Sequence, residues 1–89
     1  METENRPVEM ISVCSTDGKM QPVRFRFEDS ERTVQTAHIQ EIVCIKEISY
    51  VGIEALVYVC KARLGELERL LEIKYFVRTH RWVLFRVIY

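Results

Sequence analysis

Apolar and polar residues alternate along much of this 89-residue chain with the period of a β-strand. The clearest case is 23–28, where three apolar residues alternate with three charged ones, which predicts a strand with one buried face. The apolar segment 8–14 precedes it, and Asp17-Gly18 between the two is the strongest turn signal in the chain. The first third of the chain therefore predicts two strands and a tight turn.

The middle of the chain predicts two further strands. Residues 33–49 are dense in β-branched side chains, which favour a strand, although the isoleucines recur at a three-residue spacing that also fits a helical face. Because the parity of the apolar positions shifts near Gln40 and Glu41, we expect a bend or bulge there. Residues 55–64 are almost continuously apolar, which is typical of a central or closed-barrel strand covered on both faces.

The last twenty residues, 70–89, consist of two apolar and aromatic runs separated by the polar tetrad 78–81. Two strand-like runs joined by a short polar connection predict a β-hairpin. Leucines at helical spacing allow one short helical turn near 65–70. Like charges four residues apart would repel in a longer helix, so we expect a strand from 70 or 71 onward.

Short strands at roughly ten-residue intervals, with no alternation of strands and helices, predict a mainly β fold. We expect a small five- to six-stranded antiparallel barrel or a strongly bent sheet, SH3-like in kind, because a chain this short cannot cover both faces of an open sheet. Residues 1–7 are polar and end in a proline, which predicts a flexible N-terminal arm. The single β domain is then 8–89.

Hydrophobic anchors give the chain a family resemblance. They are Pro22-x-x-Phe25, Tyr58, Leu71 and Trp82-x-Leu84. With them the chain resembles, over 21–89, the small bacterial β-barrel domains of unknown function that open on a Pro-x-x-Phe strand and close on a Trp-x-Leu strand. The resemblance implies a barrel fold and a bacterial protein, and it carries no catalytic motif.

Composition excludes several classes of protein. The chain is 48% apolar and 29% charged with no net charge, as in an ordinary globular domain, which argues against disorder and against bulk polyelectrolyte binding. Cys14, Cys44 and Cys60 lie far apart, and their odd number without a signal peptide predicts reduced thiols in a cytoplasm. No apolar run approaches the roughly 18 residues that span a bilayer, so we expect no membrane association.

Catalytic parts are missing from the sequence. The three glycines are dispersed and form no phosphate-binding loop, and no dinucleotide or Walker pattern is present. The two histidines, His38 and His80, are far apart in sequence, and no cysteine pair has zinc-knuckle spacing. We therefore expect neither an enzyme nor a metal or cofactor site.

The placement of charge offers one candidate binding surface. No acidic residue follows Glu72, so the final hairpin interleaves basic residues with aromatic ones, as barrels do that bind single-stranded nucleic acid. The simpler interpretation, which we favour, makes the aromatics core and the charges a solvated face that also guards a sheet edge. The candidate surface consists of Arg24, Arg26, Lys74, Arg78, Arg81, Trp82 and Arg86.

The last strand is apolar on both faces. By strict alternation Trp82, Leu84, Arg86 and Ile88 share one face, and Val83, Phe85, Val87 and Tyr89 share the other. Only one face can line a small barrel, so the other needs cover from the N-terminal segment, a second copy or another protein. Our first hypothesis is a protein-interaction or oligomerisation module that forms a homodimer, and the alternative is a nucleic-acid-binding accessory domain.

Overall fold

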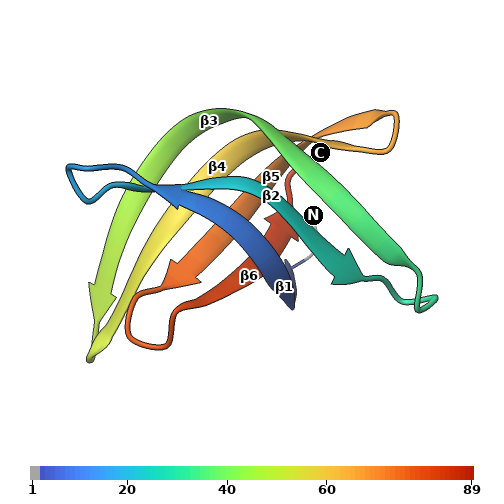
Figure 1. Cartoon of the computed structure of the whole chain (residues 1–89). Helices are drawn as coiled ribbons and strands as arrows, with labels where there is room; N and C mark the ends of the chain where they lie inside the picture. The colour runs from blue at the N-terminus through green and yellow to red at the C-terminus, as the bar shows by residue number, and fades with distance from the viewer. Residues whose placement is uncertain (1–2) are drawn as a thin grey trace.

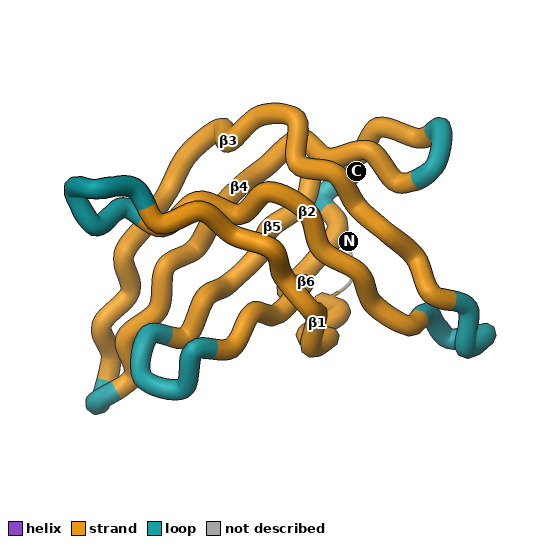
Figure 2. The backbone as a smooth tube through the Cα atoms, in the orientation of Figure 1, coloured by secondary structure: helices purple, strands orange, loops and turns teal. Residues whose placement is uncertain are grey.

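The computed structural model describes residues 3–89 and is a closed barrel of six antiparallel strands (Figure 1). Each strand pairs with its neighbour in sequence, and the first closes against the last. Short turns join the strands, and no helix occurs in residues 3–89 (Figure 2). The predicted mainly β fold, a five- to six-stranded antiparallel barrel or a strongly bent sheet, is confirmed as a closed barrel of six strands, while its SH3-like kind stays a prediction. The strands are β1 (Thr3–Cys14), β2 (Met20–Glu28), β3 (Val34–Tyr50), β4 (Ile53–Leu64), β5 (Leu67–Phe76) and β6 (Arg81–Val87).

The predicted flexible arm over 1–7 is wrong for residues 3–7, which belong to β1; residues 1 and 2 lie outside the described part of the chain. Arg6 pairs with Leu84 on β6, and its side chain extends toward the end of the neighbouring strand β2. Its guanidinium donates a hydrogen bond to the Glu28 carbonyl and lies 5.8 Å from the centre of the Phe27 ring. These polar residues form a strand because β6 offers an unpaired edge, a partner that no local pattern reveals.

The helical turn allowed near 65–70 is also wrong. Gly65 and Glu66 form a two-residue turn, and β5 begins directly after it at Leu67. The ladder between β4 and β5 runs without a bulge from the Leu64–Leu67 pair onward, and this continuous pairing outweighs local helix propensity. The bulge expected near Gln40 is confirmed by a register shift there between β3 and β4.

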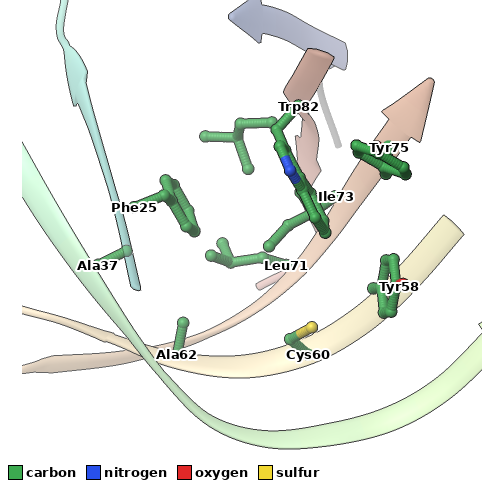
Figure 3. Packing of buried hydrophobic residues seen from close by; sticks show 10 residues of the cluster. Phe25, Ala37, Tyr58, Cys60, Ala62, Leu71, Ile73, Tyr75 and Trp82 are labelled. Atoms are coloured by element: carbon green, nitrogen blue, oxygen red, sulfur yellow. The ribbon is translucent and has the colours of Figure 1, made fainter. Parts of the chain in front are cut away.

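Side chains from β2 to β6 fill the barrel as one packed core (Figure 3). Trp82 packs against two tyrosines, with ring centres 4.7 Å from Tyr75 and 5.5 Å from Tyr58. The tryptophan of the candidate surface is therefore a core residue. The other buried members of this core are Phe25, Ala37, Cys60, Ala62, Leu71, Ile73 and Leu84.

A register shift in the last hairpin changes which residues of β6 face outward. Leu84 and Val87 both pack against the core, three positions apart instead of two. Phe85 and Arg86 lie between them on the outer face, where Arg86 pairs with Glu72 of β5. The prediction that placed Arg86 with Trp82 and Val87 with Phe85 is wrong, because this irregularity resets the alternation.

The turn between β3 and β4 stores strain at Val51. Val51 and Gly52 have φ of 48° and 80°, the two positive angles of a type I′ hairpin turn. Glycine and asparagine accept this conformation, whereas a β-branched residue is a steric outlier there. Val51 is also 82% exposed, so no packing compensates for its strain.

We expect Val51→Asn to raise the free energy of unfolding by about 1 kcal/mol, because Asn-Gly is a preferred type I′ pair. The midpoint of urea unfolding measures this gain. Val34→Asn, at an exposed strand position without positive φ, is the control and should bring no gain. Equal effects of the two substitutions would contradict the assignment of strain to Val51.

Candidate interaction surface

β3 is much longer than the strand that should cover it. It has 17 residues and β2 has 9, and β2 pairs only with residues 34–38 of β3. From residue 39 to Tyr50, β3 is paired with β4 on one side, and no strand within residues 3–89 pairs with its other side. Figure 1 shows β3 arching over the molecule and descending with β4 to a tip away from the β2–β3 turn. We call the unpaired side of residues 39–50 the free edge.

The hairpin turn fixes which backbone groups point out of the free edge. Tyr50 and Ile53 close a two-residue turn and therefore form a hydrogen-bonded pair. Since hydrogen-bonded and non-hydrogen-bonded pairs alternate along an antiparallel ladder, Ile45, Glu47 and Ser49 direct their N–H and C=O groups away from β4. These groups are available to a further strand.

The free edge lacks most devices that protect natural edges. Two register shifts interrupt its first part, at Ile39–Glu41 and at Ile42–Cys44. Residues 44–50 then run regularly with no proline and no bulge, and their only charged members are Lys46 and Glu47. A regular, weakly charged edge is a template for pairing with another chain.

Large apolar side chains are exposed along the free edge and at its tip. They are Val43, Ile45, Ile48, Tyr50, Val51 and Ile53. The tip lies beside the β5–β6 turn, where Val77 N–H donates to the Glu54 carbonyl at 3.0 Å. A shallow, mostly apolar depression separates the two turns, and it is lined by Gly52, Ile53, Glu54, Phe76, Arg78 and Thr79. Exposed apolar surface in one place marks an interaction site more often than single exposed residues do.

The predicted binding surface does not form as one patch. Trp82 is 8% exposed and faces the core, so its assignment to a surface is wrong. Arg24 and Arg26 lie on β2, whereas the other predicted cations lie on β5, β6 and the turn between them. β1 separates the two groups and adds an acid, Glu9, which bonds Arg26 at 2.7 Å.

Most cations of the final hairpin already have partners. Arg86 Nη2 lies 3.2 Å from the nearly buried carboxylate of Glu72, and Arg78 lies 3.9 Å from Glu54. Lys74 Nζ lies 3.5 Å from the centre of the Phe85 ring, the geometry of a cation–π contact. Arg81 is exposed at the start of β6. The hairpin therefore presents a mixture of paired charges rather than a row of free cations.

Sequence reasoning missed the free edge, although a signal for it was present. The predicted strand over 33–49 is nearly three times as long as the strand 23–28 predicted before it, and a long strand beside a short one must overhang. The length of this strand could not indicate whether its overhanging residues are paired, because another strand of the chain could have covered them. Strand order decides that point.

The three cysteines differ in accessibility. Cys14 and Cys44 are exposed, whereas Cys60 is fully buried in the core. Burial, with a smaller effect from the nearby Cys44 thiol, raises the pKa of Cys60 to about 12. No group of three or more His, Cys, Asp or Glu side chains in residues 3–89 could hold a metal ion.

We expect two thiols of the folded protein to react with an aromatic disulfide reagent at neutral pH, and the third only after unfolding. Thiolate is the reactive form, and Cys60 is both shielded and protonated. Absorbance of the released thiol counts the reactions with and without denaturant. Cys60→Ala should leave the count in the folded protein at two, and three rapid reactions without denaturant would contradict the burial of Cys60.

No family model matches the chain, and neither a curated protein nor a solved structure matches it. The resemblance to small bacterial barrels therefore stays a prediction. Within residues 3–89, no helix has the length and apolar character needed to cross a membrane.

Proposed function

We propose that this protein is a non-enzymatic interaction module that binds another protein chain by strand addition along the free edge of β3. The observation that carries the proposal is the unpaired, regular edge of residues 44–50, with exposed apolar side chains on it. In strand addition, main-chain hydrogen bonds supply affinity and alternate side chains supply specificity. The edge offers both, through its free N–H and C=O groups and through Ile45, Ile48 and Tyr50.

The tip supports the same function. Val51 is strained and exposed, and its neighbours Tyr50 and Ile53 are exposed as well. An isolated hairpin gains nothing from a strained valine at this turn, where asparagine would be more stable. A partner that packs on the tip buries these apolar side chains, and strained residues often lie at binding sites.

The arrangement of charge favours a protein partner over a nucleic acid. A single-strand binder needs contiguous cations beside exposed aromatic faces, and Trp82 is buried here while Arg26 and Arg86 are paired with carboxylates. We expect no binding of a labelled single-stranded oligonucleotide at low salt, measured by fluorescence anisotropy. Salt-dependent binding that Lys74→Ala weakens would favour the nucleic-acid alternative instead.

Photo-cross-linking at the tip tests the proposed function. A photoreactive phenylalanine analogue replaces Tyr50 or, as the matched control, Tyr89, since both tyrosines are 70% exposed. In cells that make the protein, illumination should give a protein adduct from position 50 and none from position 89. Either a second copy or a different protein in that adduct supports the module.

Two outcomes would overturn the proposal. The first is the absence of any protein adduct from position 50, and the second is the same adducts from both positions. The second outcome would mean that exposure alone, rather than the free edge, determines the contacts. Mass spectrometry of the cross-linked peptides separates these cases.

A further inference from the structure

We infer that the strand added to the free edge is β3 of a second copy of this chain, antiparallel to the first and with Ile48 facing Ile48 across a two-fold axis. The inference rests on the proposed function, since it names the partner of the same edge. It follows from the symmetry of antiparallel pairing and from the order of charged and apolar residues along 44–50.

Symmetry limits how two copies of β3 can pair. A two-fold axis perpendicular to the sheet makes the strands antiparallel and keeps every residue on its own face. Residues directly opposite each other in an antiparallel pair share a face. The axis must therefore pass beside one residue of β3, which then faces its own copy.

Charge excludes the two residues in the middle of the regular segment. An axis at Lys46 sets two ammonium groups directly opposite each other, and an axis at Glu47 does the same with two carboxylates. Like charges in directly opposed positions destabilise a strand pair. Neither residue therefore lies at the centre of the pair.

Length and regularity exclude the remaining residues except one. An axis at Cys44 or Ile45 brings the bulged part of β3 near Val43 into the pair, where the ladder is irregular. An axis at Ser49 pairs only residues 48–50, and an axis at Tyr50 pairs only Tyr50 itself, before the turn begins. An axis at Ile48 pairs residues 46–50 of both copies, all within the regular segment.

Every opposed pair in this register is favourable. Ile48 meets Ile48, and the Ser49 hydroxyl can donate to the Glu47 carboxylate of the other copy. Lys46 lies opposite Tyr50, so its aliphatic stem covers the aromatic ring while its ammonium group reaches water. Glu47 and Ser49, whose N–H and C=O groups point out of the edge, form the hydrogen-bonded pairs. The interface thus covers the exposed Ile48 and Tyr50.

The pairing is short, so the dimer should be weak. Stable interfaces bury about 800 Å² on each partner, and five paired residues with their side chains provide less than that. We expect sedimentation velocity to give a mass near twice 10.6 kDa at tens of micromolar, and the monomer on dilution. A protein that stays monomeric throughout this range would overturn the inference, although the cross-linking from position 50 would still decide the proposed function.

Opposite charges at the central residue provide the specific test. Ile48→Lys and Ile48→Glu should each weaken self-association on the order of tenfold, because each sets like charges across the axis. Mixing the two variants should restore a dimer. In each variant alone, the substituted residue faces a like charge, whereas in the mixed dimer a lysine faces a glutamate. This rescue occurs only if residue 48 faces its own copy. The same two substitutions at Ile11, which is 50% exposed on β1 compared with 39% for Ile48, are the controls and should leave self-association unchanged.

A cysteine provides an independent readout of the register. In a chain with Cys14→Ser and Cys44→Ser, Ile48→Cys should oxidise to a disulfide dimer, because opposed residues of a non-hydrogen-bonded pair have Cα atoms about 4.5 Å apart. Ser49→Cys should not, since each would face Glu47 of the other copy. Dimers that persist with either charge variant, charge variants that do not recombine, or faster oxidation at 49 than at 48 would each overturn the inference.

Discussion

Leu71→Ala is expected to lower the free energy of unfolding by about 2–5 kcal/mol, while Leu67→Ala on the same strand lowers it by less than about 1 kcal/mol. Leu71 has 0% of its surface exposed and lies between Cys60 of β4 and Val87 of β6. Leu67 is 58% exposed near the open end of the barrel. Removing the Leu71 side chain leaves a cavity in the packed core, whereas solvent already reaches the Leu67 side chain.

The effect is large relative to the stability of so small a domain. At about 0.05–0.15 kcal/mol per residue, a chain of this length is stable by roughly 4–13 kcal/mol, so Leu71→Ala removes a substantial fraction. Urea unfolding followed by tryptophan fluorescence measures both variants, because Trp82 lies in the same core. Similar losses from the two leucines would contradict the placement of the barrel's end near Leu67.

Tyr58→Phe is expected to lower the free energy of unfolding by about 1–3 kcal/mol, and Tyr50→Phe to leave it nearly unchanged. The buried Tyr58 hydroxyl donates a hydrogen bond to the Met20 carbonyl and so links β4 to the first residue of β2. The contact crosses the interior beside the free edge, where β2 no longer pairs with β3. Tyr50 is mostly exposed and serves as the control for loss of a tyrosine hydroxyl.

Alkaline pH gives this prediction a second measurement. Burial raises the pKa of Tyr58 above its ordinary value of 10. The unfolded chain loses the Tyr58 proton near pH 10, while the folded chain keeps it. The contribution of the protonated Tyr58 hydroxyl to the free energy of unfolding is therefore complete below pH 10 and is lost as the pH rises further. Tyr58→Phe should therefore reduce the decline in stability above pH 10, and an unchanged decline would show that Tyr58 ionises equally in both states.

The Tyr58 contact also bears on the free edge. The hydrogen bond ties the start of β2 to β4 across the interior, so Tyr58→Phe should loosen the first half of β2, while residues 39–50 of β3 keep their unpaired side. Amide hydrogen exchange at Met20 and Gln21 should then rise more than exchange within β5. The free edge itself depends on the unequal lengths of β2 and β3, which the substitution does not alter.

The sequence by itself determined the features that depend on neighbouring residues. Alternation of apolar and charged side chains located the strand around Phe25, a shift in that alternation located the bulge near Gln40, and turn residues separated the strands. These signals are local because side chains alternate between the faces of any strand, whatever its partner is. They also sufficed for the class of fold, since five or six strands without helices have few ways to close.

Only the tertiary structure decided which edges are paired and which side chains face out. Residues 3–7 join β1 because β6 offers them an edge, and Arg86 turns outward because the register of the last hairpin shifts. The free edge of β3 exists because β2 ends its pairing at His38, 12 residues before β3 itself ends at Tyr50. Each of these results depends on hydrogen bonds between one strand and another, and a strand's own residues do not specify the length or register of its partner.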